Sequence, residues 1–275
     1  MTYHDLGEGA LEYTPCRYGK SKLLFRGPRR RLDTRYVAAL GGTETYGKFV
    51  AHPYPDLTEE LLGMPVVNFG QINAGLDAFT NDPTIIAACS QAVVTVLQIS
   101  GAHNLSNRFY AVHPRRNDRF LRASTLLKTV FRNVDFTEFN FTRHLLTRLS
   151  REDPDAFKMV EAELKQAWVA RMKTLMSRIK APVVLLWMSD HSPEACTACS
   201  ENGSDPLYVD RCMLDEVTPY AAGLVEVVLT RDEVVDGLQG LVFDEMEAPA
   251  ARGLLGLLAH EKAARQLRPT IESLI

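Results

Sequence analysis

Small, polar and titratable residues follow directly after four apolar runs of the sequence. The four segments are residues 41–45 (GGTET), 70–75 (GQINAG), 100–104 (SGAHN) and 189–191 (SDH). Converging hydroxyl, imidazole and carboxylate groups can attack an acyl carbon, take up a proton and orient the base. Glycines beside them let a ligand approach the backbone closely. The segments therefore predict a small-molecule site, provided that the fold brings them together.

Buried parallel strands are the elements predicted to position these segments. Apolar, β-branched runs occur at residues 36–40, 65–69, 92–99, 182–188 and 223–229, and such runs are typical of strands covered on both faces. Helical patterns lie between them, two of which open with Asp82-Pro83 and Asp153-Pro154, as N-cap and first-turn signals. The alternation predicts an α/β fold: a three-layer α/β/α sandwich around a mainly parallel five-stranded sheet. Ligands bind such sheets beyond the carboxyl ends of the strands.

Two parts of the chain stand outside the alternation. We expect a single α/β domain over residues 1–275, with a basic extension at residues 1–35. Residues 105–150 are too long and too aromatic for a plain connection. They are predicted to form a helical insertion that folds over the carboxyl edge of the sheet.

The bulk composition argues against several kinds of partner. The net charge of −3 gives no overall attraction to nucleic acid or to anionic lipid, and no nucleic-acid-binding motif is present. The N-terminal residues lack the pattern of a signal peptide, and no apolar run approaches the roughly 20 residues that cross a bilayer. We therefore expect a cytoplasmic protein with neither nucleic acid nor membrane as a partner.

Arginines gather on either side of the first three predicted strands. One cluster precedes the first strand and the other follows the third: Arg26, Arg29, Arg30 and Arg31, then Arg108, Arg115, Arg116 and Arg119. Arginine binds phosphate, sulfate and carboxylate through paired donors. If Arg29 and Arg30 converge with Arg115 and Arg116, the ligand is anionic, for example a nucleotide, an activated sugar, a sulfate donor or coenzyme A. Solvated surface charge is the alternative.

The five cysteines give little sign of a disulfide framework, because their number is odd. Cys196 and Cys199 form one CxxC motif, with His191 before it and Cys212 after it. A structural zinc site needs four converging ligands, and a second paired motif is missing. Reduced cysteines in a surface loop are the preferred interpretation, so neither a metal nor another cofactor is predicted.

The segment LGGTETYG resembles the first block of the SGNH, or GDSL-like, hydrolases, roughly Gly-Asp-Ser-x-Thr-x-Gly. Gly42 stands on the Asp of that block and is a candidate for oxyanion or substrate binding, and Thr43 stands on its nucleophilic Ser. In VVNFGQINAG, which resembles the second block, Gly70 stands where an amide contributes to the oxyanion hole, and Asn73 is a further candidate for substrate binding. The chain also resembles a bacterial family that shares the segments FRGPRR, LGGTETYGKF and HPRRNDRFL.

Two later segments extend the resemblance. In ISGAHNLSN, His103 stands on the oxyanion-hole Asn of the third block and Asn104 on its Asp. In LAHEKAARQL, His260 stands on the catalytic base of the last block, with Leu257 where the acid is expected. The resemblance implies a flavodoxin-like strand order. With the acid missing, Asp190, Asp77 and Glu44 are candidate replacements.

Three functions are compatible with these residues. In the first, an SGNH-like hydrolase or acyltransferase acts on an acyl group or on an anionic saccharide or nucleotide, with Thr43 as nucleophile or substrate contact and His260 as base. The second is a sulfuryl, glycosyl or CoA-linked transferase that uses the arginines, and the third is a binding protein without catalysis. Structural roles compete at each position: Thr43 suits a helix N-cap, Asn73 and Asn104 suit turns, and His260 suits the exposed start of a helix.

Overall fold

Five parallel strands form the central sheet of the computed structural model, which describes residues 11–195, 203–235, 237 and 239–275. They are β1 (Val37–Gly41), β2 (Val66–Gly70), β3 (Val94–Gln98), β6 (Val183–Ser189) and β7 (Gly223–Val228). Their order is β2-β1-β3-β6-β7 and every neighbouring pair is parallel. This is the flavodoxin-like order. The predicted strands and fold class are confirmed.

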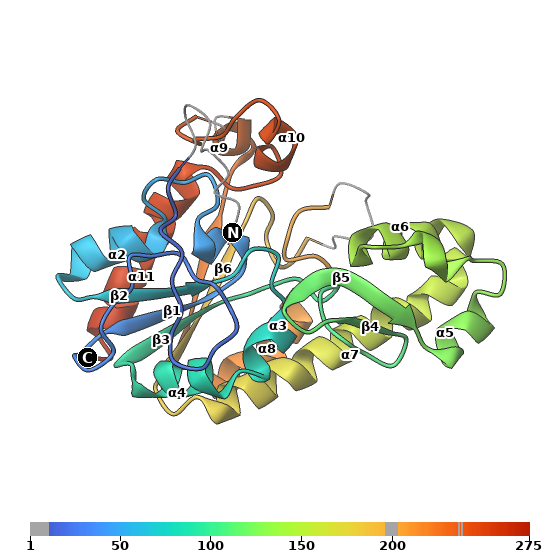
Figure 1. The fold of residues 1–275 in the computed structure, drawn as a ribbon, viewed down its shortest axis with the longest axis horizontal. Helices are drawn as coiled ribbons and strands as arrows, with labels where there is room; N and C mark the ends of the chain where they lie inside the picture. The colour runs from blue at the N-terminus through green and yellow to red at the C-terminus, as the bar shows by residue number, and fades with distance from the viewer. Residues whose placement is uncertain (1–10, 196–202, 236, 238) are drawn as a thin grey trace.

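Helices cover both faces of the sheet (Figure 1). On one face, α2 (Tyr54–Leu62) and α11 (Leu257–Glu272) share a core with strand residues such as Val37 and Val184. On the other, strand residues such as Leu40 and Leu185 pack against the remaining core helices: α3 (Leu76–Thr80), α4 (Pro83–Gln91), α7 (Pro154–Arg178) and α8 (Arg211–Val217). Successive strand side chains point to opposite faces, so each apolar strand serves both cores and the sandwich has three layers.

Both predicted helix starts are confirmed. The Asp82 carboxylate accepts hydrogen bonds from the backbone N–H groups of Thr84 and Ile85, at the start of α4. Asp153 caps α7 in the same way. Each aspartate satisfies two N–H groups that the helix itself leaves without a partner.

The segment predicted as a helical insertion contains an antiparallel hairpin as well as helices. Its elements are β4 (Tyr110–His113), β5 (Arg116–Ala123), α5 (Thr125–Val130), the 3₁₀ turn η1 (Phe136–Glu138) and α6 (Thr142–Glu152). The hairpin was missed because its apolar residues alternate over only a few positions, Tyr110 and Val112 on the buried side. Strand β5 contacts α3 and α6, so the hairpin packs against helices rather than extending the sheet (Figure 1).

The remaining elements are short and lie around the ends of the strands. They are α1 (Thr43–Tyr46), η2 (Thr218–Tyr220), α9 (Arg231–Val235) and α10 (Ala248–Ala251). Helix α1 follows β1 after a single residue, which puts a tight corner at the carboxyl edge of the sheet. Within the described ranges, no helix combines the length and the apolar character needed to span a bilayer.

Candidate functional site

A cavity of about 100 Å³ lies at the carboxyl ends of β1, β3 and β6. Its walls come from stretches of the chain that lie far apart in sequence: residues 42–44, 73–74, 98–104 except 102, 188, 204–206 and 253–255. Parallel strands bring residues of three of the four predicted segments to this cavity, those at 41–45, 70–75 and 100–104, whereas none of residues 189–191 lines it. Of the candidate site residues, Gly42, Thr43, Asn73, His103 and Asn104 line the cavity. A drug-sized ligand needs several times this volume, so the cavity suits one small chemical group.

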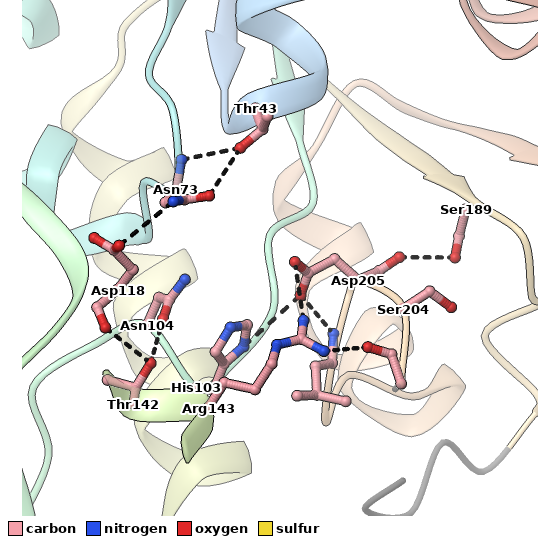
Figure 2. A network of polar contacts seen from close by, with 12 residues as sticks. Thr43, Asn73, His103, Asn104, Asp118, Thr142, Arg143, Ser189, Ser204 and Asp205 are labelled. Carbon is pink, nitrogen blue, oxygen red and sulfur yellow. Dashed lines mark hydrogen bonds and ion pairs between the residues drawn. The ribbon is translucent and has the colours of Figure 1, made fainter. Parts of the chain in front are cut away.

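Thr43 presents its hydroxyl to the turn after β2. The hydroxyl oxygen accepts the backbone N–H of Asn73 at 2.9 Å, and the hydroxyl faces the Asn73 side-chain oxygen at 3.3 Å (Figure 2). Gly42 is the N-cap of α1 and no side chain caps that helix, so the expectation that Thr43 is the N-cap is wrong. Asn73 has a positive φ of 55°, a backbone conformation that asparagine tolerates. It is both a turn residue and a site contact.

Gln98, at the end of β3, holds the β1–α1 corner. Its side-chain oxygen accepts hydrogen bonds from the N–H groups of Gly42 at 3.0 Å and Thr45 at 3.1 Å, and from the Thr45 hydroxyl at 2.6 Å. A side chain at Gly41 would clash with this arrangement, since its Cβ would lie 2.2 Å from the Thr45 hydroxyl. The Gly42 amide, a candidate oxyanion donor, is therefore already engaged by the protein.

Gly70 does not supply a free amide either. Its N–H donates to the side-chain oxygen of Asn68 at 2.8 Å, and Gly70 is not among the cavity-lining residues. A Cβ at this position would lie 2.1 Å from the backbone nitrogen of Tyr46. Glycine is required here because α1 crosses the strand end at close range. Gly70 thus positions the corner, and an oxyanion role for its amide is not supported by this geometry.

His103 is buried in the cavity wall, with 3 % of its surface exposed. Its Nδ1 lies 3.8 Å from the carboxylate of Asp205, which in turn lies 3.5 Å from the guanidinium of Arg143 (Figure 2). Nδ1 has no hydrogen-bond partner within the described chain. Burial lowers the pKa of His103 to about 4, although the charge of Asp205 opposes the shift. The imidazole is therefore neutral at pH 7.

Gly101 makes the close approach of these two side chains possible. A Cβ there would lie 2.6 Å from Nδ1 of His103 and 2.7 Å from Oδ1 of Asp205. Both contacts are too short for real atoms. The glycine at this strand end is thus explained by the packing of the imidazole and the carboxylate.

Residues of the insertion contact two of the side chains that line the cavity. Asn104 accepts the hydroxyl of Thr142, at the start of α6, through its side-chain oxygen at 2.7 Å. Asp118 on β5 lies 3.4 Å from the side-chain nitrogen of Asn73. Figure 2 shows these contacts side by side with Thr43. The hairpin and α6 thereby fix two polar side chains that line the cavity.

Glu44 and His260 meet on the other side of the corner. His260 is fully buried in α11, and its Nε2 lies 3.7 Å from Oε2 of Glu44. Glu44 lines the cavity, whereas His260 does not. Within the described chain, the hydrogen bonds of the Thr43 hydroxyl go to Asn73, so no hydrogen bond joins Thr43 to His260. The expectation of an exposed helix start at His260 is wrong.

Asp190 and His191 form a polar cluster next to the cavity but do not line it. Nδ1 of His191 lies 3.0 Å from Asp190 and 2.7 Å from the Ser189 hydroxyl, and Ser204 also bonds to Asp190. A Ser-His-Asp triad uses both ring nitrogens. Here the hydroxyl and the carboxylate converge on the same nitrogen, and Nε2 is buried without a partner in the described chain. The cluster therefore lacks the geometry of a triad.

Arg29, Arg30 and Arg31 of the first arginine cluster lie toward the amino edge of the sheet. Arg29, Arg30 and Arg31 line a separate hollow that also includes Gln91, at the end of α4 and just before β3. Arg30 pairs with Glu59 at 2.7 Å. Arg26 is buried and donates to the carbonyl oxygens of Tyr46, Gly47, Val50 and Ala51. Arg26 thus stabilises the loop after α1.

The second arginine cluster lies on the hairpin. Arg115 lies in the β4–β5 turn and Arg116 begins β5, and their backbone N–H groups donate to Nδ1 of His113 at 3.3 and 3.2 Å. Neither lines the cavity. The structure therefore does not bring Arg29 and Arg30 together with Arg115 and Arg116 in one pocket.

Asp77 and Cys212 do not line the cavity. Asp77 is buried, lies 3.1 Å from the guanidinium of Arg171 and accepts the N–H of Ser106 at 2.8 Å. Cys196 and Cys199 lie outside the described residues, and Cys212 is exposed on α8.

Several residues in and around the cavity were not predicted. Gln98, Asp205 and Arg143 belong to this group. Gln98 carried a weak signal, as the one polar residue near the end of an otherwise apolar strand. Asp205 and Arg143 come from long connections, where spacing along the chain says nothing about position in space.

Solved structures similar to this one share low sequence identity with it. They include a lipase from a goat rumen metagenome (14 % identity, 86 % of this chain and 97 % of that chain covered, TM-score 0.46). A gut microbial diltiazem-metabolizing enzyme is also similar, with 12 % identity, 86 % of this chain and 47 % of that chain covered, and a TM-score of 0.39. For a protein from Lactobacillus plantarum the identity is 12 %, the coverage is 87 % of this chain and 97 % of that chain, and the TM-score is 0.40. No curated protein matches the chain. A family model described as a domain of unknown function, DUF6473, matches residues 1–275, so the chain belongs to the DUF6473 family.

Proposed function

We propose that the cavity binds a small polar molecule through a carbonyl or carboxylate oxygen, in an SGNH-hydrolase-like cleft whose catalytic groups have been replaced. One observation carries the proposal. Nδ1 of His103 is buried in the cavity wall and has no hydrogen-bond partner within the described chain. An unpaired buried polar group costs about 1–3 kcal/mol, and a ligand that pairs with it recovers that energy.

The electrostatics favour an acceptor oxygen on the ligand. His103 is neutral at pH 7, because burial lowers its pKa to about 4. The carboxylate of Asp205, 3.8 Å from Nδ1, favours the tautomer that carries its proton on Nδ1. That nitrogen is then a hydrogen-bond donor. The nearby guanidinium of Arg143 offsets part of the negative charge of Asp205.

Binding without triad hydrolysis agrees with the contacts around Thr43. A serine hydrolase needs a base within hydrogen-bond reach of its nucleophile. The Thr43 hydroxyl instead bonds to Asn73, and the methyl group of threonine further restricts attack. The arginine-based transferase has less support, because neither Arg29 and Arg30 nor Arg115 and Arg116 line the cavity.

The test is an NMR titration of ¹⁵N-labelled protein with acetate and with acetamide. We expect shift changes at Thr43, Asn73 and His103, and affinity about fivefold weaker in His103→Gln, since one net hydrogen bond is worth about 1 kcal/mol. The matched control is His52→Gln, at an exposed position before α2. Wild-type affinity in His103→Gln, or shift changes confined to the hollow beside Arg29, would contradict the proposal.

A second candidate is acyl hydrolysis at Thr43, favoured by the fixed orientation of its hydroxyl at the cavity wall. Attack on an ester would form a bond from the Thr43 oxygen to the acyl carbon and release the alcohol, and water would then free the acid. Hydrolysis of p-nitrophenyl acetate that is lost in Thr43→Val and retained in Thr43→Ser would establish this activity. Equal rates in wild type and Thr43→Val would exclude it.

A further inference from the structure

We propose that Glu44 is the proton-donating group of the cavity and that His260 positions it from within the core. The inference rests on the proposed function of the cavity as a ligand site. It reverses the roles that the SGNH resemblance implies, since there the histidine faces the substrate and a carboxylate supports it. In this chain the carboxyl group lines the cavity and the imidazole lies behind it.

The tautomer of His260 follows from its contact with α2. Nδ1 accepts the backbone N–H of Tyr54 at 3.1 Å, and the imidazole stacks on the Tyr54 ring at 6.3 Å with an interplanar angle of 17°. A ring nitrogen that accepts a hydrogen bond carries no proton. In the neutral imidazole the proton is therefore on Nε2. Tyr54 fixes both the orientation and the tautomer of the ring.

The protonated nitrogen points toward Glu44. Nε2 of His260 lies 3.7 Å from Oε2 of Glu44 and has no hydrogen-bond partner within the described chain. The other carboxyl oxygen of Glu44 lies 3.5 Å from the backbone nitrogen of Leu255, just before α11. The Glu44 side chain is 15 % exposed, and that of His260 is 0 % exposed. Glu44 is thus held between two donors of the C-terminal segment and the cavity.

The charge states suit proton donation near neutral pH. Burial raises the pKa of Glu44 to about 8, and the charge of Asp205 acts in the same direction. Burial lowers the pKa of His260 to about 3, with a smaller contribution from the charge of Arg26. A carboxylic acid and a neutral imidazole therefore face each other at pH 7. An acid with a pKa near the working pH is efficient in proton transfer.

The proton step is simple and reversible. The Glu44 carboxyl gives its proton to an oxygen of the bound ligand and becomes a carboxylate. The Nε2–H of His260 and the N–H of Leu255 then stabilise the negative charge. Glu44 recovers a proton from solvent through the cavity. His260 keeps its own proton throughout, so it is a positioning residue.

The first test determines the tautomer by two-dimensional ¹⁵N NMR of the histidine rings, with the His260 signals assigned by comparison with His260→Gln. We expect a protonated Nε2 and an accepting Nδ1 from pH 5 to pH 8. We also expect the Nε2 shift to move in Glu44→Gln and to stay unchanged in Glu60→Gln, an exposed control on α2. A proton on Nδ1, or the same Nε2 shift in Glu44→Gln, would overturn the positioning role.

The second test concerns proton donation by Glu44. In wild type, the affinity for acetamide should fall about fivefold as the pH rises through about 8, as one hydrogen bond from the carboxyl group is lost. In Glu44→Gln it should be independent of pH, and His260→Gln should displace the midpoint. If acetamide binds at the cavity of wild type with an affinity that does not depend on pH, the inference is overturned but the proposed function is intact. Absence of binding at the cavity would overturn the proposed function, whereas the tautomer measurement would still decide the role of His260.

Discussion

Substitution of Gln98 by leucine tests how the β1–α1 corner is held. The side-chain oxygen of Gln98 accepts two backbone N–H groups, those of Gly42 and Thr45, and Gln98 is only 7 % exposed. Leucine has a similar size but no acceptor. Both N–H groups would then be buried without a partner, at about 1–3 kcal/mol each. We expect Gln98→Leu to lower the free energy of unfolding by about 2–6 kcal/mol.

Urea unfolding followed by tryptophan fluorescence measures this change. Trp168 and Trp187 are both fully buried, so both report the loss of the core. Thr45→Val is the matched control, because it removes one hydroxyl donor to Gln98 and leaves the two N–H groups paired. The Thr45 hydroxyl also hydrogen-bonds to the buried Tyr54 hydroxyl at 2.9 Å, which loses this partner in Thr45→Val. The cost of Thr45→Val should therefore be about 1–3 kcal/mol, the value for one unpaired buried polar group.

The comparison between the two variants shows whether the side-chain oxygen of Gln98 holds the β1–α1 corner. If Gln98→Leu costs no more than Thr45→Val, the amide oxygen is not what holds the corner. The m-value should stay unchanged in both variants, since neither alters the surface exposed on unfolding. A changed m-value in Gln98→Leu would mean that the substitution alters the compactness of the native or the unfolded state, and not only the pairing of two N–H groups.

Three further predictions concern stability. Asp82→Ala should cost about 1 kcal/mol in urea unfolding, because it removes an N-cap; an unchanged midpoint would contradict that role. Gly70→Ala should be far more destabilising than Gly63→Ala. A Cβ at Gly70 meets the backbone of α1, whereas a Cβ at Gly63 meets no atom and only the positive φ of 60° is strained, which costs about 1 kcal/mol. Equal melting temperatures of the two variants would refute the packing argument. His103 and His260 have pKa values lowered to about 4 and about 3, so at these two groups the unfolded state binds more protons below pH 6.5 and stability falls with the pH. Glu44, whose pKa is raised to about 8, acts in the opposite direction, because the folded state keeps its proton. Between pH 7 and pH 5 the melting temperature should therefore fall more in Glu44→Gln than in wild type, and a rise on acidification in Glu44→Gln would contradict the role of the histidines.

The fold could be predicted because its signals are local. Runs of apolar residues such as 36–40 and 182–188 are typical of strands in the interior of a parallel sheet. Asp82 and Asp153 cap helices through contacts with residues two or three positions away. Such contacts are nearly independent of the rest of the chain. The hairpin at 110–123 was missed because its short alternation is a weak signal.

The position of the site at the carboxyl edge was also available from the sequence. Parallel strands must place the residues that follow them at one edge, and Thr43, Asn73 and His103 indeed line the same cavity. Of the segments compared with the SGNH hydrolases, those with Thr43, Asn73 and His103 line the cavity, whereas His260 does not. The resemblance did not determine which side of each segment faces the cavity.

The sequence by itself determined the layers, the strands and the edge at which polar groups collect, because periodicity and capping act over a few residues. Only the tertiary structure decided which of those groups face the cavity. His260 turned out to lie behind Glu44 because Tyr54 and α11 enclose it. Gly70 lost its free amide to Asn68, and Asp205 joined His103 from a distant loop. Each of these contacts joins side chains or backbone groups whose orientation depends on the packing of the whole molecule.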